Sequence, residues 1–180
     1  MADDILQSIQ QAFRDSSQSL SVFMSHEKNM VLIERLAKKI VTIFESGGKL
    51  LICGNGGSAC DSMHFAEEFT GRFRQTRRAL PVIALTDVGH LTCVANDFGF
   101  DKVFSRGVEA YGKKGDLLIG LSTSGQSQNI ICAVEQAKKQ GLTTCLLLGK
   151  DGGLCKGMAD FEWIVPGQSR AQLALNLQQQ

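Results

Sequence analysis

Apolar residues follow a helical spacing at the start of the chain. Between residues 5 and 24 they stand at positions close to one face of a helix, namely Ile5, Ile9, Phe13, Leu20 and Phe23. A second run over residues 29–45 also places its apolar side chains on one side. This periodicity predicts two helices, and the glycines at 47 and 48 are typical of a helix C-terminus.

The pattern then changes to short, continuously apolar runs that alternate with helical patterns. The strand-like runs are residues 49–53, 81–85, 116–121, 143–148 and 161–165. The helical patterns between them cover about residues 60–71, 88–95, 102–111 and 127–140. Strands that are apolar throughout and separated by helices indicate a parallel sheet covered on both faces. The sequence therefore predicts an α/β fold, with a doubly wound parallel five-stranded sheet flanked by helices and preceded by two N-terminal helices.

Length and composition favour one domain of ordinary globular type. The chain has 180 residues, 43% of them hydrophobic. We expect a single domain over residues 1–180, with N-terminal helices (1–47), the sheet and its covering helices (48–166) and an atypical C-terminal segment (167–180). Two helices before the first strand are more than one core needs. We therefore expect another subunit to cover the apolar face of the first helix.

Charge and hydropathy exclude several function classes. Lys and Arg number 19 and Asp and Glu 18, for a net charge of +1, whereas nucleic-acid and membrane-surface binders usually carry a basic excess. No apolar run approaches the roughly 18–20 residues that cross a bilayer, and the acidic N-terminus is unlike a secretory signal. The six cysteines form no CxxC pair. We expect reduced, buried thiols in a cytoplasmic protein without nucleic-acid or membrane partners.

A loop rich in hydroxyl groups is the first candidate site. Ligands of open α/β sheets bind beyond the carboxyl ends of the strands, and the loop after the predicted strand 116–121 carries Ser122, Thr123, Ser124 and Ser127 around Gly125. Hydroxyl donors beside the free N–H groups of a helix N-terminus suit a phosphate monoester. The alternative is that one serine simply caps the helix. Four hydroxyl groups around a glycine favour phosphate binding.

The loop after the first predicted strand, residues 54–59, is rich in glycine. Its sequence Gly-Asn-Gly-Gly-Ser-Ala also matches a variant of the dinucleotide fingerprint. That fingerprint expects an acidic residue about 20 positions further on, which holds a ribose hydroxyl. Here the corresponding region is basic, from Arg72 to Arg78, and we interpret it as a solvated loop. We therefore expect no nucleotide cofactor.

A histidine and several carboxylates follow the glycine loop. In a helix His64 and Glu68 share one face, Asp61 lies one turn before them, and Glu67 points about 100° away. A His-x-x-x-Glu pair can bind a divalent ion, and such a carboxylate can act as a general base. The alternative is a surface pair that stabilises the helix by a few tenths of a kcal/mol. Both interpretations stay open on the spacing alone.

Asn96 and Asp97 form a polar pair after the predicted helix 88–95. Phe98 and Phe100 flank the pair on its C-terminal side. Such a pair could reach sugar hydroxyls, but the pattern by itself favours a turn.

Taken together, these motifs resemble the phosphoheptose isomerases, a family of the sugar-isomerase (SIS) fold. The matching segments are 53–58, 64–72, 95–100, 121–125 and 149–153, and the similarity runs from the N-terminal helix to about Pro166. The resemblance implies an aldose–ketose isomerase that converts sedoheptulose 7-phosphate to D-glycero-D-manno-heptose 7-phosphate, the first step of lipopolysaccharide heptose biosynthesis. It also implies a homotetramer whose active sites lie between subunits.

The resemblance further assigns roles by position. The implied contacts to the phosphorylated seven-carbon sugar are Asn55, Gly56, Gly57, Glu68, Asn96, Asp97 and Gln172, with Ser122, Thr123, Ser124 and Ser127 around its phosphate. His64, Glu68 and Gln172 would bind zinc, one ion per subunit. Glu68 would also be the catalytic group that transfers the proton. The chemistry agrees, because a carboxylate can remove a proton next to a carbonyl while a metal ion or aligned donors stabilise the enediolate.

The sequence departs from this family after the last predicted strand. The family continues with an Arg-Ile-Gln-Glu-x-His pattern, whose helix supplies a zinc-ligating glutamine and an acid–base histidine. Here Arg170-Ala171-Gln172 is the remnant, and no histidine follows it. The resemblance then implies at most three protein ligands for zinc. An alternative from another class is a non-catalytic phosphosugar-binding SIS regulator similar to a replication initiator-associating protein, which lacks the His-Phe-Ala-Glu-Glu run present here at 64–68.

Overall fold

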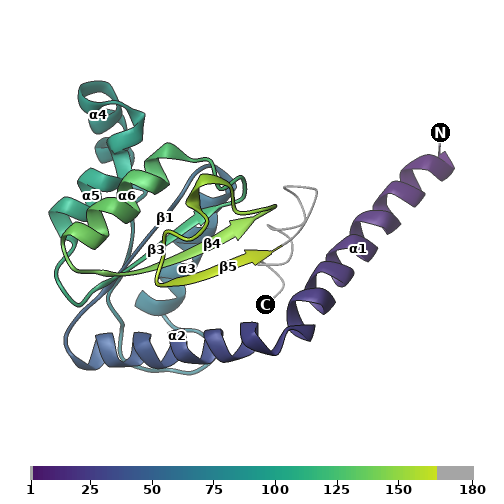
Figure 1. Cartoon of the computed structure of the whole chain (residues 1–180), viewed down its shortest axis with the longest axis horizontal. Coiled ribbons are helices and arrows are strands. Elements are labelled where there is room, and N and C mark those ends of the chain that lie inside the picture. The colour runs from purple at the N-terminus through teal and green to yellow at the C-terminus, as the bar shows by residue number, and fades with distance from the viewer. Residues whose placement is uncertain (1, 166–180) are drawn as a thin grey trace.

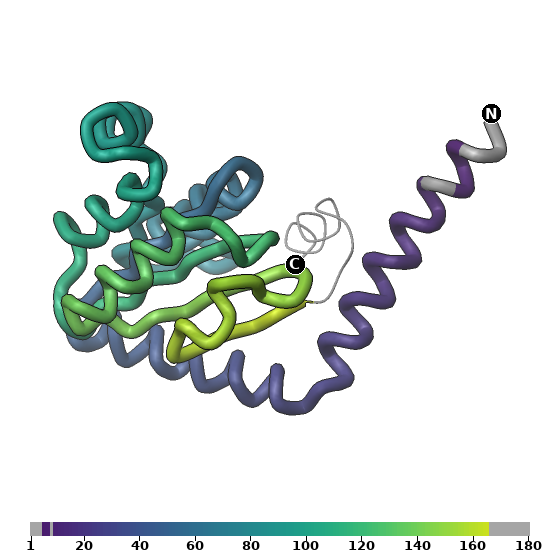
Figure 2. The backbone as a smooth tube through the Cα atoms, turned by 45° about the horizontal axis from the view of Figure 1, so that its top comes forward, coloured from purple at the N-terminus to yellow at the C-terminus, as the bar shows by residue number. Residues whose placement is uncertain are grey.

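The computed structural model describes residues 2–165, and two long helices come first. They are α1 (Ala2–Ser25) and α2 (Glu27–Glu45), which meet at His26, a residue with extended backbone. The helix α2 lies along the sheet, whereas α1 projects away from the rest of the molecule (Figures 1 and 2). The difference follows from packing, because α2 buries Ile43 and Phe44 in the core, while none of the α1 side chains that the structure describes is fully buried.

Five strands form one parallel sheet, as the sequence predicts. They are β1 (Leu50–Gly54), β2 (Val82–Ala84), β3 (Leu117–Ser122), β4 (Thr143–Gly149) and β5 (Phe161–Val165). Their order in the sheet is β2-β1-β3-β4-β5, and every neighbouring pair is parallel. The predicted doubly wound fold is therefore confirmed.

Helices cover both faces of this sheet. The helices α2 and α3 (Gly57–Thr70) pack on one face, and α4 (Val88–Phe98), α5 (Val103–Tyr111) and α6 (Gln128–Lys139) lie on the other. Short 3-10 turns, η1 (Phe100–Lys102) and η2 (Gly153–Cys155), complete the described chain. Successive residues of a strand pack alternately into the two hydrophobic cores, one on each face of the sheet. Ile52 and Ile119 face α2 and α3, whereas Leu51 and Leu118 face α5 and α6.

The direction of the strand order reverses between β1 and β3. The chain leaves β1 toward α3 on one face and leaves β3 toward α6 on the other. The helices that follow these two neighbouring strands therefore cover opposite faces of the sheet. In open α/β sheets this is the position where ligands bind, and both candidate loops of the sequence lie there.

Two helix boundaries differ from those predicted by the sequence. The helix α3 begins at Gly57, so the second half of the glycine-rich segment forms its first turn. The helix α4 continues through Phe98, and the predicted turn at Asn96 and Asp97 is wrong. Their polar side chains are exposed on the last turn of the helix, and the chain turns instead at Gly99, whose φ is +91°.

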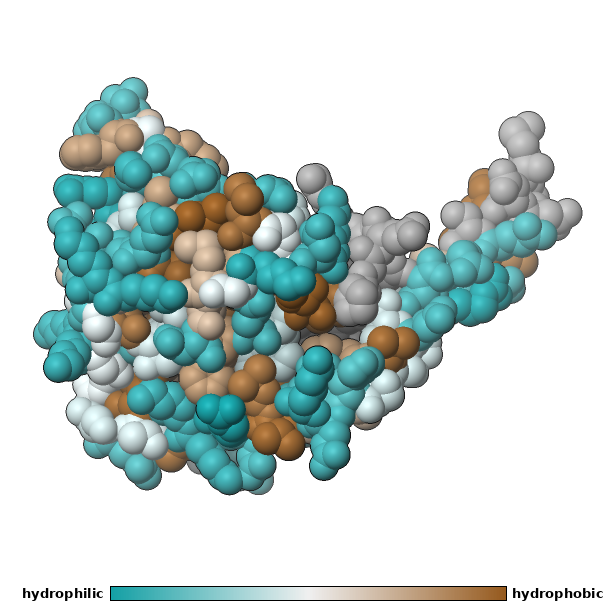
Figure 3. Space-filling view, viewed as in Figure 1, coloured by the Kyte–Doolittle hydropathy of each residue, from teal (hydrophilic) through white to brown (hydrophobic). Residues whose placement is uncertain are grey.

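The projecting helix α1 exposes an apolar stripe. Ile5, Ile9 and Phe13 are 64%, 50% and 65% exposed, and Figure 3 shows apolar side chains among the polar ones along this helix. An uncovered stripe of this kind is a feature of interaction surfaces. Among residues 2–165, no helix is both long enough and apolar enough to span a bilayer.

Candidate active site

The glycine loop and the serine loop lie side by side at the carboxyl edge of the sheet. Gly54 at the end of β1 pairs with Leu121 near the end of β3. Beyond them, Asn55 and Asn129 exchange two side-chain amide hydrogen bonds of 2.9 and 2.8 Å. Asn129 is 3% exposed and lies in the first turn of α6. This buried amide pair ties the glycine loop to the start of the helix that follows the serine loop.

The hydroxyl groups of the serine loop bond largely within the loop. The Oγ atoms of Ser122 and Ser127 are 3.1 Å apart, and Ser122 Oγ also accepts from the backbone N–H of Gly125 at 3.1 Å. Ser127 occupies the N-cap position of α6, but its side chain makes no capping hydrogen bond. Simple helix capping by Ser127 is therefore not the arrangement found. Its hydroxyl lies beside the free end of α6, where an anion is favoured.

A second glycine-rich segment, residues 149–153, packs directly against the backbone of the serine loop. Gly125 has a φ of +64°, and a Cβ placed on it would lie 2.0 Å from the carbonyl oxygen of Gly152. A Cβ on Gly149 would lie 2.6 Å from the carbonyl oxygen of Thr123. Only glycine permits such close approach of two backbones. Sequence reasoning gave residues 149–153 no role, and the contact explains their composition.

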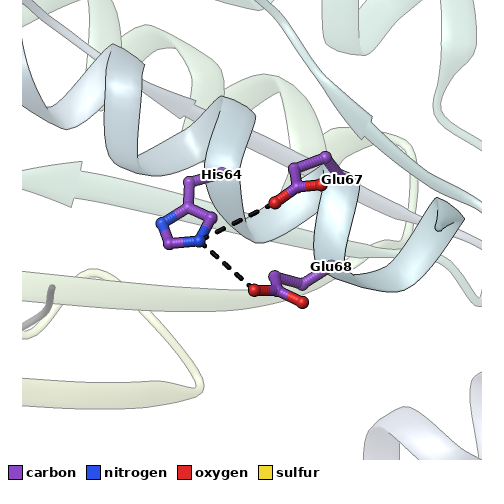
Figure 4. A group of neighbouring side chains, drawn as sticks. All are labelled: His64, Glu67 and Glu68. Atoms are coloured by element: carbon purple, nitrogen blue, oxygen red, sulfur yellow. Dashed lines mark ion pairs between the residues drawn. The ribbon is translucent and has the colours of Figure 1, made fainter. Parts of the chain in front are cut away.

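A histidine and two glutamates gather on α3. His64 Nε2 lies 3.3 Å from Glu68 Oε1 and 3.7 Å from Glu67 Oε1 (Figure 4). One ligand atom from each of the three side chains lies within 4.8 Å of the others. One imidazole nitrogen and carboxylate oxygens form a donor set that zinc accepts. The spacing predicts the pair of His64 and Glu68 but not the approach of Glu67. The Glu67 side chain is long and flexible, and it places its carboxylate near the His64 ring.

His64 and Glu68 line a cavity of about 510 Å³ between α2, α3 and the sheet. Most of the residues that line it are apolar, and its polar lining residues also include Asp61 and Arg77. Burial raises the pKa of the Asp61 carboxyl, and the neighbouring His64 partly offsets this. The side chain of Glu68 is 30% exposed, so its carboxylate is sheltered by the cavity yet accessible from solvent.

Within one copy of the chain the serine loop and the His64–Glu68 pair lie apart. None of the four hydroxyl side chains lines the cavity. The helix α3 joins two parallel strands and so runs back from the carboxyl edge of the sheet. With a rise of about 1.5 Å per residue, Glu68 lies about 16 Å along the axis from Gly57 at the start of the helix. Asn55, Gly56 and Gly57, by contrast, lie at the edge where the serine loop begins.

Asn96 and Asp97 bond to each other and within their own helix, and neither lines the cavity. Asn96 Nδ2 donates to Asp97 Oδ1 at 2.7 Å, and Cys93 Sγ donates to Asp97 Oδ2 at 3.6 Å. Within residues 2–165, no hydrogen bond links this pair to either loop. Gln172, predicted as a zinc and substrate ligand, lies outside the described residues.

Comparisons with known proteins identify the family. The SIS domain family model matches residues 12–149. A phosphoheptose isomerase from Fusobacterium nucleatum is 58% identical over 158 residues, which cover 88% of this chain and 81% of that protein. The chain belongs to the phosphoheptose isomerase family.

Solved structures of phosphoheptose isomerases agree with this assignment. The enzyme from Francisella tularensis superposes with a TM-score of 0.90 at 36% identity, covering 96% of this chain and 91% of that one. The enzyme from Neisseria gonorrhoeae gives a TM-score of 0.84 at 34% identity, covering 98% and 91%. The resemblance and the SIS fold predicted from the sequence are thus confirmed, and these relatives do not favour the alternative of a non-catalytic regulator.

Proposed function

We propose that this protein is an aldose–ketose isomerase that converts sedoheptulose 7-phosphate to D-glycero-D-manno-heptose 7-phosphate, the first step of lipopolysaccharide heptose biosynthesis. The observation that carries the proposal is the His64–Glu68 pair beside a cavity, on a chain 58% identical to a phosphoheptose isomerase. We place the reaction in the cytoplasm.

The phosphate end of the substrate is assigned to the serine loop. Ser122, Thr123, Ser124 and Ser127 offer hydroxyl donors, and the N-terminus of α6 adds unpaired N–H groups and a favourable potential. Asn55, Gly56 and Gly57 adjoin this loop and would contact the sugar. Asn96 and Asp97 would bind hydroxyl groups of the same substrate.

We assign the proton transfer, at the carbonyl end of the sugar, to Glu68. Isomerisation moves a proton from C1 of the ketose to C2, through an enediolate, and a carboxylate at the substrate can accept and return that proton. Its shelter in an apolar cavity strengthens electrostatic interactions with the reacting atoms. His64 lies 3.3 Å from the carboxylate and holds it in place.

The donor set on α3 also fits zinc, which we propose as the cofactor at one ion per subunit. His64 and Glu68 would hold the ion, with Gln172 as a further ligand from outside the described residues. When bound, zinc supplies positive charge that stabilises the oxygens of the enediolate.

Replacing His64 with alanine is expected to lower zinc affinity at least about tenfold, because it removes the only nitrogen ligand of the group. Bound metal measured by mass spectrometry after dialysis checks this. His26→Ala is the matched control, since that exposed histidine lies at the α1–α2 junction. Equal zinc content in both variants would show that the metal, if bound, lies elsewhere.

We further propose a homotetramer with active sites between subunits. Two observations support it: the exposed apolar stripe of α1, and the separation of the serine loop from Glu68 within one copy. A second copy that covers α1 could bring its own α3 to the serine loop of the first. Closed symmetric assemblies of this kind are common among soluble proteins.

A glutamate at Phe13 is expected to break the assembly into smaller species, because it places a charge in the stripe that another subunit would bury. Sedimentation velocity of Phe13→Glu at micromolar concentration measures this. Gln18→Glu adds the same charge at an exposed polar position of α1 and should leave the assembly intact. If Phe13→Glu sediments like the wild type, α1 does not form the interface.

An assay of the purified full chain tests the activity itself. The zinc-loaded protein is incubated with sedoheptulose 7-phosphate, and the aldose product is followed by NMR. We expect conversion, with little or none when sedoheptulose lacks its phosphate. Binding of the sugar phosphate without conversion would instead support the regulator.

A further inference from the structure

Arg77 has a role that the sequence does not reveal. The sequence predicts a solvated loop from Arg72 to Arg78, yet Arg77 folds back onto the end of α3. The guanidinium of Arg77 donates to the carbonyl oxygen of Glu68 at 2.5 Å and to that of Phe69 at 2.8 Å. One of its nitrogens also donates to the carbonyl oxygen of Arg78 at 2.9 Å.

These two carbonyl groups belong to the last turn of α3. A helix leaves its last four carbonyl groups without partners inside the helix, and a cation at this end is favoured by the helix dipole. The last turn of α3 contains no basic residue of its own. Arg77, nine residues after Glu68, supplies that cation from the following loop.

Arg77 also lines the cavity beside His64 and Glu68. Its guanidinium lies over the ring of Phe69, 5.9 Å from the ring centroid, and that ring packs against Phe65 with centroids 4.8 Å apart. Arg77 is thus held between the helix end and an aromatic cluster. Among the ion pairs of the described chain, the Glu68 carboxylate pairs with His64 and not with Arg77, so Arg77 acts on Glu68 through its backbone.

We infer that Arg77 is a positioning residue that fixes the last turn of α3 and thereby the direction of the Glu68 carboxylate. This inference rests on the proposed isomerase function. A planar guanidinium can bind two neighbouring carbonyl groups at once, whereas the ammonium group of lysine is a compact point donor. The geometry therefore requires arginine at this position rather than positive charge alone.

The test compares Arg77→Ala and Arg77→Lys with Arg78→Ala in the zinc-loaded full chain. We expect kcat to fall about 10- to 100-fold in Arg77→Ala, the effect of a shift of about 1 Å in a reacting group. KM should change less than about threefold, because the serine loop holds the phosphate elsewhere. Arg77→Lys should fall between Arg77→Ala and the wild type, and Arg78→Ala, which keeps its backbone carbonyl, should match the wild type.

Two further measurements separate positioning from a general loss of structure. Added ethylguanidinium should restore part of the activity of Arg77→Ala and none of that of Glu68→Gln. Amide hydrogen exchange should quicken in peptides from the last turn of α3 in Arg77→Ala and stay unchanged in the core strand β3. If Arg77→Ala does not fold, the same readouts apply to Arg77→Lys.

The outcomes distinguish this inference from the proposed function. An inactive wild type would refute the isomerase proposal, while the exchange measurement would still report on the contact between Arg77 and α3. An active wild type together with an unchanged kcat in the Arg77 variants would overturn the inference alone. Equal losses in Arg77→Ala and Arg78→Ala, or a loss in Arg77→Ala that ethylguanidinium does not relieve, would also overturn it.

Discussion

Glu68→Gln is expected to lower kcat by about 10²- to 10⁴-fold, the contribution typical of a positioned acid–base group. The amide has the shape of the carboxylate but cannot accept a proton. Because the side chain is 30% exposed, the fold should tolerate the change, with a free energy of unfolding within about 0.5 kcal/mol of the wild type. Steady-state kinetics with sedoheptulose 7-phosphate, alongside thermal unfolding, provides the measurement.

Glu67→Gln is the matched control for this prediction. Glu67 is the adjacent residue on α3 and its carboxylate also approaches His64, at 3.7 Å, but its side chain is 67% exposed and is absent from the cavity wall. We expect its activity to stay within a few fold of the wild type. If Glu67→Gln lost as much activity as Glu68→Gln, the proton transfer could not be assigned to Glu68.

Gly125→Ala is expected to weaken substrate binding at least about 100-fold. The new methyl group would lie 2.0 Å from the carbonyl oxygen of Gly152, so the serine loop must move away from the glycine segment behind it. Hydrogen bonds to a charged group contribute about 1.5–3 kcal/mol each, and displacing the loop removes more than one of them. Titration calorimetry with the sugar phosphate, and with inorganic phosphate, measures the loss.

Gly47→Ala is the control that measures the cost of a positive φ at alanine without the steric clash expected in Gly125→Ala. Gly47 also has a positive φ, +76°, but a Cβ there would meet nothing within 4 Å. Both substitutions place alanine in the left-handed region, which costs about 1–2 kcal/mol, whereas only Gly125→Ala disturbs the serine loop. Comparable phosphate affinity in the two variants would mean that the serine loop does not bind phosphate.

Much of the fold can be predicted from the sequence because the strands of a parallel sheet are buried on both faces. Apart from Asp116, the run of residues 116–121 carries no polar side chain, and all five predicted strands are found. The end of α4 is harder to predict from the sequence. Asn96 and Asp97 are common in turns, but here they lie exposed on the last turn of the helix, and the chain turns at Gly99 instead.

Site contacts between residues of one helix can be predicted from the sequence, whereas contacts that depend on the folding of separate segments cannot. Residues four apart in a helix share a face, which predicts the pair of His64 and Glu68. The contact of Arg77 with the end of α3 spans nine residues and depends on how a loop returns. The packing of Gly125 on Gly152 joins segments after two different strands. The spacing of residues along the chain does not predict contacts of this kind.

The central claim is that the serine loop and Glu68 act on opposite ends of one sugar phosphate. A crystal structure of the zinc-loaded protein with a hydroxamate analogue of the enediolate that retains the phosphate would measure this directly. The account predicts phosphate oxygens at hydrogen-bond distance, about 2.5–3.0 Å, from the hydroxyl groups of residues 122–127, with the hydroxamate against the Glu68 carboxylate of the same or a neighbouring subunit. A ligand whose phosphate occupies the serine loop while every Glu68 faces another surface would contradict it.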